Sequence, residues 1–173
     1  SAFADKLTGN AGVNTLTGNA GNDLLDGGAG GDVLVGGTEN DTYMVDNVAD
    51  QVIENAGEGT DTVKSSVTYG LSANVDKLVL TGTANIDATG NDLANTLTGN
   101  AGDNLLLGGL GKDFLSGGAG NDTLNGGQSA DKLTGGLGLD TFLLDIFESS
   151  VNKDTITDFT VGEDHIALTR SAF

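Results

Sequence analysis

Between residues 108 and 142, a single large apolar side chain recurs every nine residues. These apolar positions are Leu115, Leu124, Leu133 and Phe142. Each stands in the middle of a three-residue segment, a pattern that predicts a very short strand with one side chain pointing inward. The spacing therefore predicts many short strands joined by turns.

Glycine pairs mark these turns, and they begin at Gly108, Gly117, Gly126 and Gly135. Two glycines, or a glycine and an asparagine, permit the positive φ angles of a tight turn. A turn plus a short strand makes half a circuit, so two nine-residue units should close one coil of 18 residues. The predicted fold class is all-β: a parallel β-roll (a right-handed β-helix or solenoid) of 18-residue coils, with the apolar side chains filling its thin interior.

An aspartate stands at position six of each unit, two residues before the apolar residue of position eight. In an 18-residue coil, carboxylates of successive coils would lie about 5 Å apart. Two such charges repel by about 1 kcal/mol in water and by roughly 3 kcal/mol at an effective dielectric of 20. Such a column requires cations between its coils. Carboxylate and carbonyl oxygens suit a hard cation, and calcium fits their number and flexible geometry better than magnesium.

The unit GGAGNDTLN at residues 117–125 resembles the calcium-binding nonapeptide GGxGxDxUx of the repeats-in-toxin (RTX, haemolysin-type) family. Similar units cover essentially the whole chain. The resemblance implies a parallel β-roll, calcium held in the turns, and secretion from a Gram-negative bacterium by a type I system. It also implies an extracellular location, at the cell surface or free, and the type I secretion machinery as a partner of the parent protein.

Composition agrees with a metal-stabilised secreted module. The chain has 173 residues and a net charge of −18, which argues against partners such as nucleic acid and anionic membrane surfaces. It contains 29 glycines and no cysteine, so metal binding has to replace disulfides as the stabilising cross-link. No cleavable signal peptide and no apolar run of membrane-spanning length is present, so we expect no membrane insertion. The start at Ser1 is typical of an excised fragment.

Four segments follow from the periodicity. Residues 1–44 form a first nonapeptide array, and residues 90–143 form a second one. Residues 45–89 lose the period but remain rich in β-branched residues, which predicts irregular, wider β coils that join the arrays. The alternative is a separate small β insertion. Residues 144–173 resemble the capping segment that follows such arrays, so one continuous solenoid with a C-terminal β cap is expected.

Each array closes with an aromatic residue at position eight, Tyr43 in the first and Phe142 in the second. We expect these rings to plug the ends of the two narrow cores. Three units carry another residue in place of the glycine of position four, namely Glu39, Leu93 and Ser129. We expect the turn geometry that calcium needs to be altered at Leu93 and Ser129.

The candidate side-chain ligands share position six of their units. They are Asp5, Asn14, Asp23, Asp32, Asp41, Asn95, Asn104, Asp113, Asp122, Asp131 and Asp140. The candidate backbone ligands are turn carbonyls, those of Gly9, Gly18, Gly27, Gly28, Gly30, Gly36, Gly99, Gly108, Gly109, Gly111, Gly117, Gly118, Gly120, Gly126, Gly127, Gly135, Gly136 and Gly138. Pairing residues eighteen positions apart gives about seven calcium ions, with each carboxylate inside a column bridging two ions. Sites with an asparagine should be weaker because their ligand is neutral.

Without metal, the backbone entropy of about 1–2 kcal/mol per ordered residue exceeds what so thin a core returns. We therefore expect a largely disordered calcium-free chain. Calcium sites of extracellular modules have dissociation constants of about 10⁻⁴–10⁻³ M, so these would be empty in the cytosol and filled outside. The expected function is a calcium-binding β-roll module that folds on extracellular calcium after export and supports a larger secreted protein.

Other functions fit the residues less well. The chain lacks HExxH and GxSxG motifs, and its one histidine, His165, is expected to face solvent in the cap, so a catalytic role is not expected. A calcium-rigidified segment of a surface adhesin, contacting a ligand or surface directly, is the main alternative. Ice binding through the recurrent TGN triplets is disfavoured, because Thr8 and Thr17 are nine residues apart and so fall on opposite edges of the coil.

Overall fold

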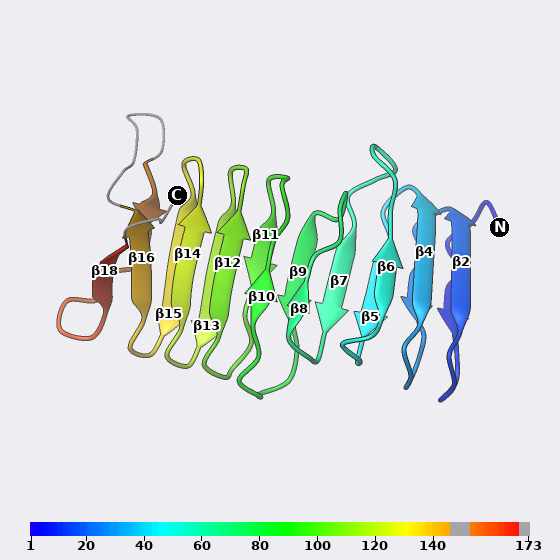
Figure 1. Ribbon diagram of the computed structural model, residues 1–173, viewed down its shortest axis with the longest axis horizontal. Helices are drawn as coiled ribbons and strands as arrows, with labels where there is room; N and C mark the ends of the chain where they lie inside the picture. The colour runs from blue at the N-terminus through cyan, green and yellow to red at the C-terminus, as the bar shows by residue number, and fades with distance from the viewer. Residues whose placement is uncertain (146–152, 170–173) are drawn as a thin grey trace.

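The computed structural model describes residues 1–145 and 153–169, and these form a stack of parallel strands with no helix among them (Figure 1). One wall is a nine-stranded sheet of β1 (Lys6–Thr8), β3 (Leu24–Asp26), β5 (Thr42–Val45), β7 (Thr62–Ser65), β9 (Lys77–Leu80), β11 (Thr96–Thr98), β13 (Phe114–Ala119), β15 (Lys132–Leu137) and β17 (Thr155–Ile156). Its strands follow in that order, so every second strand of the chain adds to the same wall.

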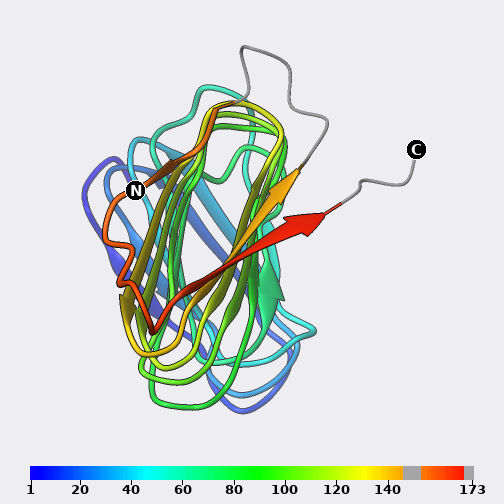
Figure 2. The ribbon, with the colours of Figure 1, turned by 90° about the vertical axis from the view of Figure 1, so that its left-hand side faces the viewer.

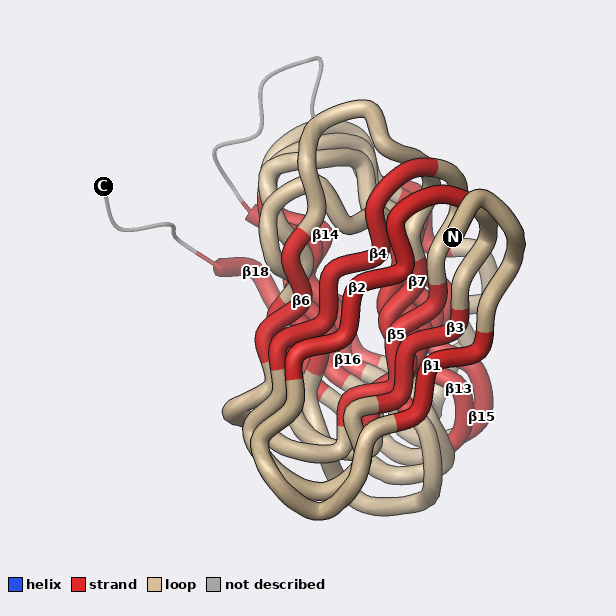
Figure 3. The backbone as a smooth tube through the Cα atoms, turned by 90° about the vertical axis from the view of Figure 1, so that its right-hand side faces the viewer, coloured by secondary structure: helices blue, strands red, loops and turns tan. Residues whose placement is uncertain are grey.

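The opposite wall consists of two sheets. The three-stranded sheet contains β2 (Thr15–Ala20), β4 (Val33–Thr38) and β6 (Gln51–Ile53). The six-stranded sheet contains β8 (Tyr69–Gly70), β10 (Ala88–Thr89), β12 (Leu105–Gly109), β14 (Thr123–Gly127), β16 (Thr141–Asp145) and β18 (His165–Thr169). Viewed from either end, the coils outline a flattened tube between these walls (Figures 2 and 3). The predicted all-β parallel solenoid is confirmed.

The register between coils confirms the 18-residue period within the arrays, where Leu115 pairs with Leu133 and Leu16 pairs with Leu34. The middle of the chain is less regular. Thr42 pairs with Thr62 and Thr62 with Lys77, so one coil has 20 residues and the next has 15. The prediction of uniformly wider coils is therefore wrong for the second of these. The strands of this segment nonetheless belong to the same sheets as those of the arrays.

The core is a single file of side chains from position eight. Its fully buried members in the arrays are Leu25, Leu34, Tyr43, Leu97, Leu106, Leu115, Leu124, Leu133 and Phe142. Burying one such side chain contributes about 1.5–3 kcal/mol, which leaves each coil with only a small apolar contribution. The residues of the middle segment, such as Val63 and Leu78, extend the same core.

The aromatic residues do not close two separate cores. Tyr43 lies in β5, which pairs with β7 as well as β3, so the core continues past it and the prediction that it plugs an end is wrong. Phe142 lies in β16 between β14 and β18, and its ring contacts Phe159, with the ring centroids 6.2 Å apart. His165 is exposed in β18, as predicted.

The C-terminal segment extends both walls, because β17 pairs with β15 and β18 pairs with β16, all in parallel. The coils lengthen here, since Lys132 pairs with Thr155 and Thr141 with His165. Residues 146–152 and 170–173 of the predicted cap lie outside the described residues. Within the described ranges, no helix has the length and apolar character needed to cross a membrane.

Candidate metal centre

The aspartates of position six lie in the turns, directly before the strands, and their side chains are buried. Asp113 and Asp140 have no exposed surface, and Asp122 and Asp131 are exposed by only 1% and 2%. The strand that follows each aspartate directs the leucine of position eight into the core, which holds the aspartate over the edge of the coil. The nonapeptide spacing therefore places a column of carboxylates along one edge of each array.

One oxygen of each carboxylate is used by the preceding coil. The backbone N–H of Asp113 donates to Oδ1 of Asp131 at 2.8 Å, and that of Asp122 donates to Oδ1 of Asp140 at 2.9 Å. The same bond, with the acceptor 18 residues after the donor, joins Asp5 to Asp23, Asn14 to Asp32, Asp23 to Asp41, Asn95 to Asp113 and Asn104 to Asp122. The prediction that each carboxylate bridges two ions is wrong, because Oδ1 is committed to this bond.

The other oxygen is buried without a hydrogen-bond partner. Among the described residues this holds for Oδ2 of seven aspartates: Asp23, Asp32, Asp41, Asp113, Asp122, Asp131 and Asp140. A buried, unpartnered carboxylate oxygen is costly, because it has lost its hydration and gained nothing in return. These seven oxygens are the strongest structural indication of a ligand.

The glycine of position one leaves open the space that these oxygens face. A Cβ on Gly18 would meet Oδ2 of Asp23 on one side and the carbonyl oxygen of Gly36, in the next coil, on the other. The same arrangement recurs around Gly108 and Gly117, with the carbonyl oxygens of Gly126 and Gly135. A carboxylate oxygen of one coil and a carbonyl oxygen of the next thus meet beside a glycine. This all-oxygen donor set fits calcium.

The electrostatics agree with an ion between the coils. Burial is the main cause that raises the pKa of Asp113 and Asp122 to about 6 and that of Asp131 to about 7. Hydrogen bonds from the preceding coil oppose the rise but do not cancel it. At neutral pH, ionised carboxylates are therefore held in surroundings that disfavour their charge, and a divalent cation would relieve this.

The predicted backbone ligands divide by place. The carbonyl oxygens that lie beside the position-one glycine of the preceding coil are those of Gly27, Gly36, Gly108, Gly117, Gly126 and Gly135. Those of Gly109, Gly118 and Gly120 lie against turn glycines of the next coil, and that of Gly109 accepts the N–H of Gln128. The carbonyl of Gly18 accepts bonds from Ser1 and Asn19. The carbonyls of Gly9, Gly28, Gly30, Gly99, Gly111, Gly127, Gly136 and Gly138 stay predictions.

The three asparagines of position six are bonded within their own turns. Oδ1 of Asn104 accepts the N–H of Asn100 at 2.8 Å, and its Nδ2 donates to the carbonyl of Ile86 at 2.6 Å. Asn95 repeats this with Asn91 and Val75, while Oδ1 of Asn14 accepts the N–H of Asn10. In these turns an amide group donates to carbonyls of the preceding coil, so hydrogen bonds stabilise the turn without an ion. We therefore do not carry the asparagines forward as ligands.

Turn geometry tolerates two of the three replacements at position four. Glu39 and Ser129 adopt positive φ angles of 79° and 88°, in the same region as turn glycines such as Gly120 at 112°. Leu93 does not adopt a positive φ. The expectation of an altered turn is therefore correct for Leu93 and wrong for Ser129, where the conformation is kept at a cost in backbone strain.

Sequence reasoning missed five further aspartates in these columns. Each accepts the backbone N–H of a column residue in the preceding coil: Asp50 from Asp32, Asp61 from Asp41, Asp76 from Asp61, Asp154 from Asp131 and Asp164 from Asp140. The signal is present in the sequence as an aspartate followed two residues later by an apolar residue, as in Asp61 and Val63. Without the glycine pair, that signal was too short to recognise.

Comparison with known families gives one match. A family model described as the RTX calcium-binding nonapeptide repeat (4 copies) matches residues 2–43, 89–124 and 107–142, which together make up more than half of the chain. The matched ranges contain all seven aspartates with an unpartnered buried oxygen. A search of curated proteins found no match.

Proposed function

This chain belongs to the RTX calcium-binding nonapeptide-repeat family, and we propose that it is a module of a larger secreted protein that folds when it meets extracellular calcium. Its identity as a calcium-binding β-roll follows from the family and the fold. The proposed part is the use of calcium as a folding signal after type I secretion. In this role the module stabilises or supports the parent protein and is itself non-catalytic.

The observation that carries the proposal is the set of seven buried Oδ2 atoms without partners. Each faces a space beside a glycine, where a carbonyl oxygen of the next coil is also found in the clearest examples. An ion bound there would join two coils that the thin leucine core holds only weakly. In the unfolded chain these oxygens are far apart, so the binding energy becomes folding energy.

We propose about seven ions, one for each such aspartate. Seven divalent ions would reduce the net charge from −18 to about −4, which removes most of the repulsion along the columns. The absence of cysteine supports the same role for metal, since the chain has no disulfide to hold the coils together. The ions would therefore provide both the cross-links and the charge compensation.

The compartment follows from affinity. Extracellular calcium modules bind with dissociation constants of about 10⁻⁴–10⁻³ M, far above the free calcium of the cytosol. The chain would then remain unfolded and exportable inside the cell and would fold outside. The type I secretion machinery is the proposed partner for this step, and the extracellular space or cell surface is the proposed location.

The test is far-UV circular dichroism of the purified chain during a calcium titration, with magnesium as the control. We expect a disordered spectrum in chelator and a cooperative change to β structure near millimolar calcium, but not with magnesium. A chain that is already folded in chelator would overturn calcium-triggered folding, although it would leave calcium binding intact. A chain that responds equally to both cations would contradict the choice of calcium.

A further inference from the structure

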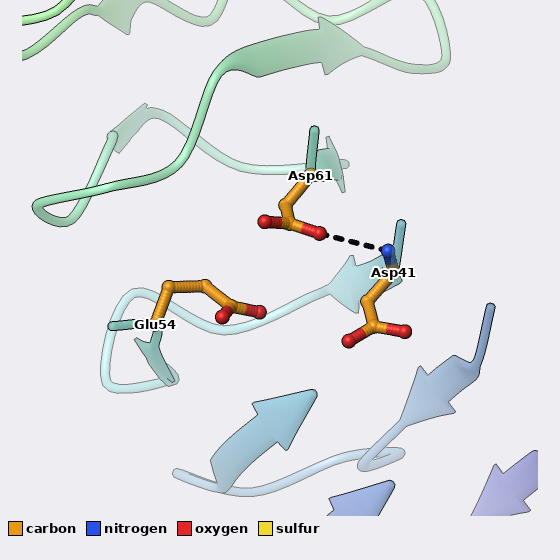
Figure 4. A group of neighbouring side chains, drawn as sticks. All are labelled: Asp41, Glu54 and Asp61. Carbon is orange, nitrogen blue, oxygen red and sulfur yellow. Dashed lines mark hydrogen bonds between the residues drawn. The ribbon is translucent and has the colours of Figure 1, made fainter. Parts of the chain in front are cut away.

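The end of the first array contains a buried group of three carboxylates that the nonapeptide pattern does not predict. Asp41 precedes β5, Glu54 follows β6 and Asp61 precedes β7, and Figure 4 shows their side chains converging from these three segments. One ligand oxygen from each lies within 4.8 Å of the others. We propose that this group is an additional calcium site, here called the junction site, which rests on the calcium-binding role proposed above.

Two of the three side chains have a buried oxygen without a partner. Glu54 is only 7% exposed and Asp41 only 1%, yet Oε2 of Glu54 and Oδ2 of Asp41 accept no hydrogen bond. The third carboxylate, Asp61, is also 1% exposed, and its Oδ1 accepts the N–H of Asp41 at 2.8 Å. The cluster is thus built into the interior of the solenoid and is not a group of surface acids.

Glu54 stands where the nonapeptide has its first glycine. The register of β4 and β6 pairs Val35 with Ile53, so Glu54 follows Gly36 by one coil. In the coil before, the carbonyl oxygen of Gly36 lies beside Oδ2 of Asp23. The carbonyl of Glu54 instead accepts a hydrogen bond from Nδ2 of Asn74, at 2.9 Å. The side-chain carboxylate therefore takes the place of the missing carbonyl ligand.

The tyrosine hydroxyl completes the oxygen-rich surroundings. Tyr43 is fully buried, and its hydroxyl donates to Oε1 of Glu54. A Cβ on Gly36 would meet both this hydroxyl and Oδ2 of Asp41, so the glycine again leaves the space open. All the donors are oxygens from separate, non-helical segments, which suits the larger coordination shell of calcium better than the strict octahedron of magnesium.

The charge at the junction site is not balanced by the protein. Among the described residues, the one ion pair joins the N-terminal ammonium to Asp5, so no lysine or arginine neutralises these carboxylates. Burial first, and then the negative charges of Asp61, Asp41 and Glu58, raise the pKa of Glu54 to about 8. A site with three carboxylates should bind calcium more tightly than a repeat site with one carboxylate and carbonyl oxygens.

The structural consequence is a link between the array and the irregular coils. Asp41 belongs to the last unit of the first array, whereas Glu54 and Asp61 belong to the segment that follows. In the same region the opposite wall changes from the three-stranded to the six-stranded sheet. An ion at the junction site would hold the coils together where one wall is interrupted.

Terbium luminescence tests the proposal in the whole chain, because Tb³⁺ replaces calcium at oxygen sites and its emission is excited through a nearby tyrosine. The chain has two tyrosines, Tyr43 and Tyr69, and no tryptophan. With less than one equivalent of Tb³⁺ added, we expect sensitised emission that Tyr43→Phe removes to a much greater extent than Tyr69→Phe. Absent emission, or a larger loss with Tyr69→Phe, would overturn the proposal.

Glu54→Gln then tests the ligand directly, with Glu163→Gln in the exposed cap as the matched loss of one charge. We expect native mass spectrometry in calcium to count one ion fewer for Glu54→Gln, and terbium binding that is roughly tenfold weaker or more. Equal ion counts and equal emission in both variants would assign the cluster to a protonated glutamic acid without a metal. Circular dichroism in calcium confirms that each variant is folded, and the tyrosine variants decide the proposal if Glu54→Gln does not fold. Failure of calcium-triggered folding would instead appear in the wild-type titration.

Discussion

The backbone N–H of Asp113 lies 2.8 Å from Oδ1 of Asp131, one coil further along the chain. This bond sets the role of the whole column. It fixes each carboxylate by one oxygen, turns the other oxygen toward the space beside a glycine, and leaves it without a protein partner. The nonapeptide is therefore a device that holds one carboxylate oxygen per unit ready for an ion.

Adding a methyl group in that space should remove an ion. Gly117 does not require a positive φ, so Gly117→Ala is compatible with the backbone, but its Cβ would overlap Oδ2 of Asp122 and the carbonyl of Gly135. We expect one ion fewer by native mass spectrometry and a higher calcium midpoint in circular dichroism. Gly70→Ala is the control, because its Cβ meets only Thr89, at 3.8 Å. An unchanged midpoint for Gly117→Ala would contradict the assigned space.

Relieving backbone strain at position four should stabilise the folded module. Ser129 has a φ of 88°, in the region that glycine adopts without a steric penalty. We expect Ser129→Gly to raise the free energy of unfolding in saturating calcium by about 1 kcal/mol, as measured by denaturant unfolding. Ser129→Ala keeps the Cβ and should give no such gain. If both variants behave alike, the strain is not what limits this turn.

Converting an asparagine of position six to aspartate should not create a better site. Nδ2 of Asn104 donates to the carbonyl of Ile86, and Asn104→Asp replaces this donor with a negative oxygen facing a carbonyl. We expect a loss of about 1–3 kcal/mol in the free energy of unfolding at saturating calcium. An Asn104→Asp variant that gains one ion and keeps its stability would show that this turn can accept calcium after all.

Acidification should favour structure in the calcium-free chain. The folded state raises the pKa of Asp113 and Asp122 to about 6 and that of Asp131 to about 7, above the ordinary value of 3.8. Between pH 4 and 7 the folded chain thus holds more protons than the unfolded chain, so its stability falls as the pH rises. In chelator, we expect the β signal in circular dichroism to increase from pH 7.5 to pH 5, which is still above the isoelectric point of about 4.1.

Calcium should act in the opposite direction, because binding requires the ionised carboxylates. We expect the calcium midpoint of folding to rise as the pH falls from 7.5 to 5. A chelator-treated chain whose spectrum does not change over this range, with a calcium midpoint that also stays constant, would show that the buried carboxylates are not raised in pKa.

The sequence by itself determined everything that repeats. Because each coil contacts the coil 18 residues away, a local period fixes the register of Leu115 on Leu133, the inward direction of position eight and the column of aspartates. The columns of Asp23 and Asp122 could therefore be predicted without coordinates. A repeated local pattern carries its own tertiary neighbours, which is why the solenoid was accessible.

Only the tertiary structure decided what each carboxylate oxygen contacts. The bond from Asp122 to Oδ1 of Asp140 depends on the rise and twist between coils, which no residue pattern encodes. The coils of 20 and 15 residues that follow Thr42 lack the glycine pairs, so their columns were invisible in the sequence. Glu54 meets Asp41 and Asp61 only because those irregular coils bring three unrelated segments together. Where the period ends, the contacts become long-range and non-repeating, and folding alone defines them.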